Sequence, residues 1–302
     1  MPRPALSADR ALQVIDVLVA HPTQRFTLTE LSRRTSINPA SAHALLAVML
    51  RAGYVQRHPE HKTYTLGPAL VAAGETALEQ LPALRLARDR LASLSDQLEL
   101  EVMLTSPTDE EIIFVARAGR ASAYGLVLQV GQRVPLHPPL GLVFLAWASD
   151  EKIGRWLDRA EPALTPDDVE HQLHTLSAVR ERGFSIGLES PARQGIGQAM
   201  LEERGSITDL LSALGRVPYQ LDVVEEQATY DVTMIAAPIF DANREIVAAL
   251  SVVGFAPGLP AQEIVRIGIT VRNAAVVITK ESQGRLPDVW AVDPAVLRSS
   301  SS

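Results

Sequence analysis

Apolar residues recur at helical spacing in two short segments between residues 27 and 53, and a turn separates them. The run Ser-Ile-Asn at 36–38 breaks the first pattern. Pro39 suits the first position of a helix that Asn38 caps, and Gly53 suits its end. The apolar stripe of this second helix consists of Ala42, Leu45, Leu46, Met49 and Leu50. The spacing therefore predicts a helix, a tight turn and a helix.

Two β-like runs follow, at 54–57 and 62–66, and the sequence His-Pro-Glu-His between them is typical of a hairpin loop. An earlier helix is expected to start at Ser7 or Asp9, to end near Ala20 and to pack behind these elements. Its expected apolar face carries Leu12, Ile15 and Val19. A helix-turn-helix with a trailing hairpin predicts a winged DNA-binding domain, whose second helix enters the major groove.

The pattern after residue 66 predicts an α+β domain with helices against a mostly antiparallel sheet. The helix expected at 68–81 precedes this domain. The expected helices of the domain lie at 84–98, 140–148, 150–158, 166–182 and 260–280, and its expected strands at 100–106, 111–118, 124–130, 232–240 and 246–255. We divide the chain into a reader at 7–66, a linker helix at 67–81, a second domain at 82–282 and a tail at 283–302.

Length and composition agree with two soluble domains. The chain has 302 residues, of which 47% are hydrophobic, and this suffices for two cores. It has no cysteine, which fits a reducing compartment. No signal peptide and no apolar run of about 20 residues stands in the sequence, so we expect a cytoplasmic protein that does not enter a membrane.

Charge is distributed unevenly along the chain. Residues 1–66 contain eight Arg or Lys and four Asp or Glu, a net charge of +4. Because the whole chain has a net charge of −7, the remaining residues have a net charge of −11. A basic end on an acidic body is expected when one domain meets phosphate groups. A small solvated basic surface explains the charge equally well.

Four stretches together resemble the IclR family of bacterial transcription regulators. They are 28–66, Val130 to Ala146, Arg180 to Ser190 and Asp231 to Gly254, of which the Ala-Ala-Pro-Ile-Phe-Asp run in the last is the most specific. The resemblance implies a winged reader, a linker helix and a GAF-like domain that binds a small effector, often an organic or aromatic acid. It also implies dimers, or pairs of dimers, on palindromic operators.

The resemblance and the helix-turn-helix pattern indicate a set of DNA-contacting residues. Ser41 and His43 stand at the exposed start of the second helix, where side chains reach base edges or phosphates. Ala44 stands where the family usually has Arg. The full predicted set is Arg33, Arg34, Ser41, His43 and Arg51, with a weaker group in the wing, Arg57, Lys62 and Tyr64.

The same resemblance indicates an effector site in the second domain. Gly141 follows the loop 137–140 and is expected to let a ligand approach backbone amides at a helix start. The expected lining is Leu126, Leu128, Leu140, Gly141, Phe144, Met234, Ser251 and Val253. Met234, Val253 and Gly187 replace polar residues common in the family, which predicts a more apolar or larger ligand. Each aliphatic side chain also fits an ordinary core, and loss of effector sensing stays open.

The segment 191–230 is about 36 residues longer than the family's usual connection at this place. It contains two short amphipathic stretches that glycines separate. Such an excursion is a lid, a contact surface or a mobile loop. The sequence does not choose among these.

A few residues of the chain could also belong to an enzyme. Glu170, His171 and His174 fall within one helical turn, but without a third defined ligand they are more typical of a solvated helix face than of a metal site. The sequence contains no Gly-x-Ser-x-Gly elbow, phosphate loop or dinucleotide fingerprint. We therefore predict no catalytic residue, no metal and no cofactor. The alternatives are an effector-independent DNA-binding repressor and a small-molecule enzyme with an accessory helix-turn-helix.

Overall fold

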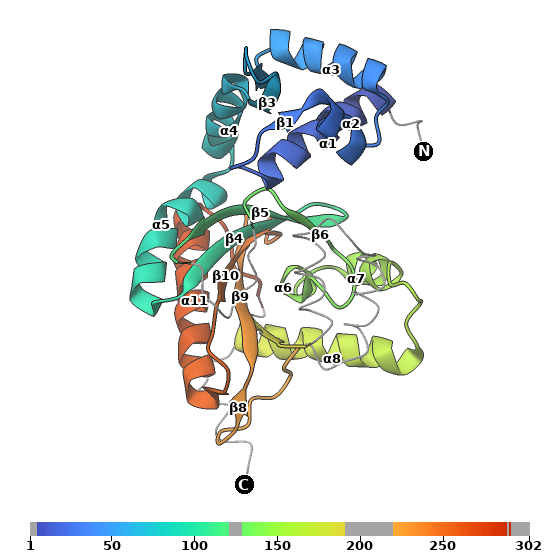
Figure 1. Ribbon diagram of the computed structural model, residues 1–302. Coiled ribbons are helices and arrows are strands. Elements are labelled where there is room, and N and C mark those ends of the chain that lie inside the picture. Colours follow the sequence, from blue (N-terminus) through green and yellow to red (C-terminus); the bar gives the residue numbers. More distant parts are fainter. Residues whose placement is uncertain (1–4, 121–128, 191–219, 289, 291–302) are drawn as a thin grey trace. The chain divides into compact units, whose positions relative to one another are not determined.

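The computed structural model describes residues 5–120, 129–190, 220–288 and 290 (Figure 1). The chain forms two compact units. The first comprises Met1–Pro82 and Gln129–Gln132, and the second comprises Ala83–Leu128 and Arg133–Ser302. No helix in the described ranges is long and apolar enough to cross a membrane.

The first unit is a winged helix-turn-helix. Its helices are α1 (Leu6–Ala20), α2 (Leu28–Arg34), α3 (Pro39–Arg51) and α4 (Pro68–Gln80), and its strands are β1 (Phe26–Thr27), β2 (Val55–Arg57) and β3 (Thr63–Leu66). The strands form an antiparallel sheet in the order β1-β3-β2. The predicted helices and hairpin are confirmed. Strand β1 was not predicted, because two residues are too few to show an alternating pattern.

Local chemistry fixes the ends of the two central helices. The Thr27 and Glu30 side chains form a capping box at the start of α2, where the Glu30 carboxylate accepts from the Thr27 amide at 2.7 Å. At the start of α3 the Asn38 side chain accepts from the Ser41 amide at 2.9 Å, which confirms the predicted cap. Gly53, just beyond the end of α3, has φ of +77°, a conformation that glycine adopts readily.

The start and the buried face of α1 differ from the prediction. Neither Ser7 nor Asp9 caps the helix, which begins after Ala5 without a side-chain cap. Val14 and Leu18 are its buried residues, whereas Leu12 is exposed. Apolar residues occur on more than one side of this helix, so periodicity alone did not select the face that packs on the core.

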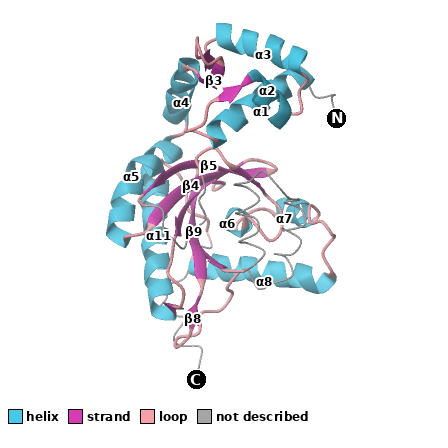
Figure 2. Ribbon diagram, viewed as in Figure 1, coloured by secondary structure: helices cyan, strands magenta, loops and turns pink. Residues whose placement is uncertain are grey.

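The second unit is built on a six-stranded antiparallel sheet in the order β6-β5-β4-β10-β9-β7 (Figure 2). The strands of this sheet are β4 (Glu101–Pro107), β5 (Glu111–Ala118), β6 (Arg133–Pro135), β7 (Ser185–Leu188), β9 (Val232–Phe240) and β10 (Ile246–Val253); β8 (Thr229–Tyr230) and β11 (Leu259–Pro260) pair separately. The predicted α+β class with a mostly antiparallel sheet is confirmed.

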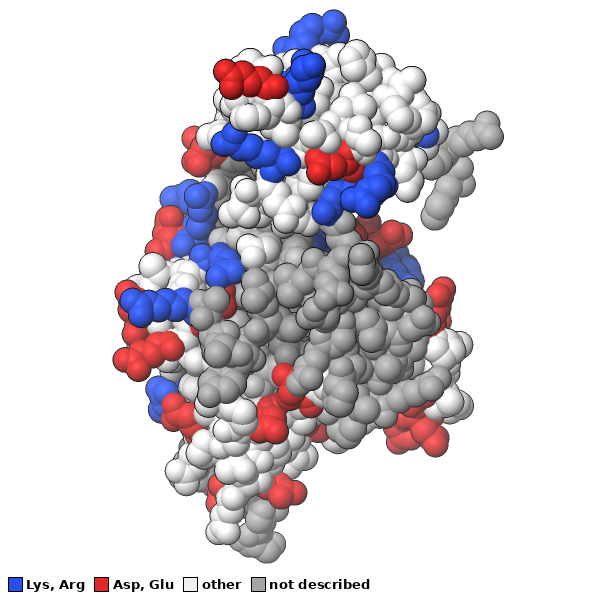
Figure 3. Space-filling view, in the orientation of Figure 1, with Lys and Arg blue, Asp and Glu red and all other residues white. Residues whose placement is uncertain are grey.

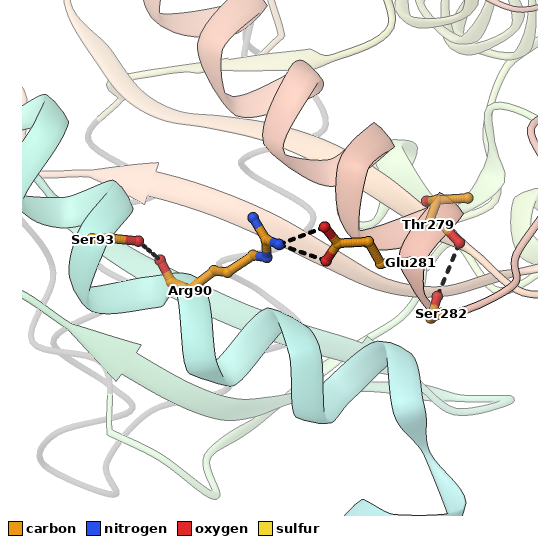
Figure 4. Close-up of polar contacts among 5 residues, drawn as sticks. All are labelled: Arg90, Ser93, Thr279, Glu281 and Ser282. Carbon is orange, nitrogen blue, oxygen red and sulfur yellow. Dashed lines mark hydrogen bonds and ion pairs between the residues drawn. The ribbon is translucent and has the colours of Figure 1, made fainter.

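Helices cover both faces of this sheet. On one side lie α5 (Pro82–Leu98) and α11 (Ala261–Glu281); on the other lie α6 (Leu142–Leu145), α7 (Asp150–Leu157) and α8 (Pro166–Arg182) (Figure 1). Burial on both faces explains why β9 and β10 are nearly continuous apolar runs. Arg90 on α5 donates to both carboxylate oxygens of Glu281 on α11, at 2.7 and 2.5 Å (Figure 4).

Two predicted segments of this unit need correction or fall outside the described residues, and two of its strands were not predicted. The expected helix at 140–148 is only the four residues of α6. Most of the expected strand at 124–130 lies outside the described residues, and residues 129–130 are not in a strand. Strands β6 and β7 were not predicted, because runs of three and four residues carry little period-two signal.

The predicted tail begins with residues that pack on the second unit. The Arg285 amide donates to the Asp241 carbonyl at 2.9 Å. Leu286 and Trp290 pack against the apolar cluster of α6, α7 and α8, and Trp290 stacks on Trp147 with ring centroids 5.2 Å apart. These contacts hold the described start of the predicted tail, 283–302, against the second unit.

Candidate functional site

Helix α3 presents one face to the core of the first unit and the other to solvent. Ala42, Leu46 and Met49 are its buried residues. Since successive residues of a helix turn by about 100°, the centre of the opposite face carries Ala40, Ala44, Ala47 and Arg51, all exposed. This row, with its flanking residues His43, Val48 and Leu50, is called the α3 outer face below.

The two polar residues predicted to contact DNA lie on opposite flanks of the α3 outer face. His43 is exposed on the flank shared with Leu50, and Ser41 is half-buried on the flank shared with Val48. A groove that receives α3 would therefore meet three alanines and, in the last turn, Arg51 at the centre of the face. Each edge carries one polar and one apolar residue. The sequence located the helix but not this division of its surface.

The predicted arginines of the helix-turn-helix differ in their surroundings. Arg33 and Arg51 are exposed in the last turns of α2 and α3. Arg34 is half-buried, and its guanidinium carbon lies 5.0 Å from the centroid of the Phe26 ring. Cation–π packing therefore holds Arg34 against the core.

The predicted wing residues also separate into two kinds. Arg57 and Lys62 are exposed at the end of β2 and in the loop before β3. Tyr64 is only 5% exposed and belongs to the core of the first unit, so its side chain stabilises the wing and does not match the predicted DNA contact. On the face drawn in Figure 3, basic side chains of this unit occur at separate places, with acidic ones among them.

In the second unit, strand register brings three predicted effector residues onto one face of the sheet. Ser251 pairs with Ala236, and Val253 pairs with Met234. Directly opposed residues of an antiparallel pair point to the same side. Ala236 and Ala249 of this face pack in the cluster that includes residues of α6 and α8. The face therefore looks toward these two helices.

The remaining predicted effector residues do not form a single group. Phe144 of α6 is buried in the same cluster. The Leu140 carbonyl accepts from the indole nitrogen of Trp156 at 3.0 Å. Leu126 and Leu128 lie outside the described residues.

The backbone conformation and the close packing at residue 141 both require a glycine there. Its φ is +90°, and a side chain there would bring Cβ to 2.2 Å from Cδ1 of Leu136. The glycine thus allows a left-handed turn packed on the core. It precedes a helix of only four residues, so the predicted approach of a ligand to a helix start loses its geometric support.

Glu101 and Arg117 are two charged residues on this sheet face that the sequence did not predict as site residues. Glu101 pairs with Val253 across β4 and β10, and its side chain is 1% exposed. Its Oε1 lies 2.9 Å from Nε of Arg117, which is 27% exposed. Burial raises the pKa of Glu101, and the positive charge of Arg117 opposes this shift. A glutamate at the start of a strand normally indicates an exposed strand end, and only the register shows otherwise.

A second buried charge, Arg182, contacts Asp222 in the described end of the segment 191–230; residues 191–219 lie outside the described residues. Burial lowers the pKa of Arg182 to about 10, and Asp222 opposes this shift. Nη1 of Arg182 donates to the Asp222 carbonyl at 2.9 Å. The Asp222 carboxylate lies 3.3 Å from Nδ1 of His174 and 3.8 Å from Nδ1 of His171. The described residues contain no His, Asp or Glu group arranged to hold a metal ion.

The two units define a class of protein: a winged helix-turn-helix transcription regulator with a second α+β domain. Family models agree on both parts. The IclR helix-turn-helix domain matches residues 7–59, and the C-terminal domain of the bacterial transcriptional regulator IclR matches residues 75–196 and 188–280. The chain belongs to the IclR family.

Proteins with similar sequences include transcription regulators. The HTH-type transcriptional regulator KdgR of Dickeya chrysanthemi is 27% identical over 184 residues, which are 59% of this chain and 60% of KdgR. The Pca regulon regulatory protein of Pseudomonas putida is 24% identical over 252 residues, covering 82% of this chain and 73% of that protein. The match to KdgR thus spans less than two thirds of that relative's length.

Solved structures share the fold. An IclR transcriptional regulator from Alicyclobacillus acidocaldarius aligns with a TM-score of 0.65 at 20% identity, over 93% of this chain and all of that one. An IclR homologue from Microbacterium hydrocarbonoxydans, solved in complex with 4-hydroxybenzoate, aligns with a TM-score of 0.61 at 21% identity, over 92% of this chain and 99% of that one.

Proposed function

We propose that the protein regulates transcription by binding operator DNA through α3, and that a small organic acid bound by the second unit controls this binding. The observation that carries the proposal is the α3 outer face, a solvent-exposed helix surface in a capped helix-turn-helix. Among the exposed charged side chains of α2, α3 and the wing, Arg33, Arg51, Arg57 and Lys62 are basic, and Glu30 and Glu60 are acidic. No catalytic step is part of the proposed function.

Phosphate contacts in this proposal come from Arg33 and Arg51, and from Arg57 and Lys62 in the wing. All four side chains are exposed. Such contacts position the protein on the duplex and carry no sequence information, whereas groups facing the groove select the sequence. Arg34 contributes less, since its guanidinium already packs on Phe26.

The proposed effector site is the sheet face that carries Met234, Ser251 and Val253. Ser251 supplies a hydroxyl among apolar side chains. Arg117 on the same face is paired with Glu101 through Nε, and a ligand carboxylate would share its guanidinium group with Glu101. A relative of the same fold was solved with 4-hydroxybenzoate, which supports an aromatic acid as the first ligand to test.

An effector-independent repressor is the second candidate. Ser251 and Val253 are each 3% exposed, so a ligand reaches them only if the elements over this face move. Thermal unfolding with a panel of aliphatic and aromatic acids separates the two candidates. Stabilisation by one acid, abolished in Ser251→Ala, supports the effector site; no stabilisation by any acid supports the repressor.

We also propose that the protein acts as a homodimer through α4. This helix has no buried residue, and Val71 and Leu81 expose apolar side chains on it and at its end. Two readers joined in this way fit the two halves of a palindromic site. An effector that binds one arrangement of the readers better than another changes DNA affinity by that difference. Sedimentation of wild type and Val71→Asp tests the dimer, which the substitution should weaken.

Selectivity tests the placement of the reader. Replacing Ser41 and His43 together by alanine should reduce the ratio of operator to random-sequence affinity, because side chains on both flanks of α3 are removed. The matched control replaces Ser93 of α5, an exposed serine whose hydroxyl donates to the Arg90 carbonyl (Figure 4). Equal selectivity in both variants and wild type would place the reader elsewhere.

A further inference from the structure

The α3 outer face is largely apolar. Every residue of α3 lies in the described part of the chain, and the helix contains no acidic residue, no asparagine and no glutamine. Val48 is 53% exposed and Leu50 is 41% exposed, beside the exposed Ala44 and Ala47. Asparagine and glutamine, the side chains that form paired hydrogen bonds with adenine, are therefore absent, and Arg51 in the last turn is the one arginine of the helix.

The chemistry of the major groove limits what such a surface can recognise. Each base edge there presents hydrogen-bond donors and acceptors, and thymine alone adds a methyl group. Alanine and other small apolar side chains contact this methyl group, and the contact removes apolar surface from water. The position of the apolar residues on the helix predicted to enter the groove, with basic residues beside it, makes duplex DNA the occupant of this face.

We propose that Ala44, Ala47 and Val48 read thymine methyl groups, so that operator half-sites contain thymines at fixed positions. This inference rests on the proposed DNA-binding function and names the chemical group that the site recognises. Val48 lies on the same flank as Ser41, while Ala44 and Ala47 lie at the centre of the face. Small side chains at the centre let the helix approach the bases closely, which a methyl contact requires.

The test uses the full chain and DNA in which single methyl groups are deleted. A preferred duplex is first selected from a random-sequence pool, and each thymine is then replaced by deoxyuridine, which lacks the methyl group and keeps the hydrogen-bonding pattern. Burial of one methyl group corresponds to about a four-fold change in affinity. We expect a loss of about this size at one or more thymines in each half-site and an unchanged salt dependence, because phosphate contacts are retained.

A variant pair assigns the effect to the helix. Val48→Ala should reduce the deoxyuridine effect at one position and leave the other positions unchanged. Val277→Ala, on the exposed side of α11, is the matched control and should leave every position unchanged. Both valines are exposed, so neither change opens a cavity in a core.

The outcomes separate this inference from the function on which it rests. A selected sequence whose thymines all tolerate deoxyuridine overturns methyl readout, and specificity then comes from DNA shape or from the polar flanks. The DNA-binding function stands in that case. Selection of no sequence at all overturns both.

Discussion

Glu101 illustrates how much a single residue's meaning depends on its neighbours. Its place at the start of β4 suggested nothing unusual, yet pairing with Val253 puts a carboxylate on the face where Ser251 and Met234 also lie. An ion pair in such a place brings a desolvation cost that its Coulomb attraction offsets only in part. Arg117 is partly exposed and so keeps part of its hydration.

Glu101→Gln should change how stability depends on pH. The folded-state pKa of Glu101 is raised, so the wild type loses stability as pH rises from the unfolded value through the folded one. Glutamine does not titrate. The Tm of the variant should therefore exceed that of the wild type at pH 7.5, and the difference should shrink toward pH 4 in differential scanning calorimetry. A difference that stays constant or grows on acidification contradicts the burial of a charged Glu101.

Arg33 and Arg34 are adjacent in sequence and should respond differently to substitution. Arg33→Ala should weaken binding to all DNA sequences and reduce the salt slope by about 1, with stability unchanged, because the exposed guanidinium is free to meet phosphate. Arg34→Ala should lower the stability of the first unit, because packing on Phe26 is lost. Titrations from low to high salt and denaturant unfolding measure both. The assignments are wrong if the two variants behave alike.

Elements with strong local end signals were predicted closely. The predicted ranges 166–182 and 232–240 coincide with α8 and β9. Thr165 and Asp168 form a capping box at the start of α8, and Gly183, with φ of +82°, ends the helix. Residues next to each end therefore determine both boundaries of α8. The face of α1 and the strands β6 and β7 were missed, because packing partners far away in the sequence decide them.

The caps of α1 and α3 supply a matched test at this scale. Asn38→Ala removes a side-chain bond to the Ser41 amide and should cost about 1 kcal/mol of stability in the first unit. Ser7→Ala in α1 should change little, since no side chain caps that helix. Denaturant unfolding followed by hydrogen exchange measures the first unit separately. A loss in Ser7→Ala as large as that in Asn38→Ala would contradict the described caps.

At the scale of the whole chain, the sequence predicted the fold class and the order of the two domains. It predicted fewer of the residues that lie at the candidate sites. Ser41 and His43 were predicted from their place in a helix-turn-helix, a local pattern. The Glu101 and Arg117 pair was not predicted, because it depends on the register of β4 and β5, which places Met103 opposite Arg117. The burial of Tyr64 likewise follows from contacts with the helices of the first unit. Contacts between residues far apart in the sequence decide which side chains are buried, and the pattern of a single sequence predicts these contacts poorly.

The most direct test of DNA regulation is the affinity of the full chain for the intergenic DNA upstream of its own gene. Fluorescence anisotropy would compare that duplex with a scrambled duplex of equal length and composition, across a salt series, with and without 4-hydroxybenzoate and related acids. The proposed function predicts tighter binding to the upstream duplex at each salt concentration, and a change of that affinity with one of the acids. Equal affinity for both duplexes, with and without every acid, would contradict it.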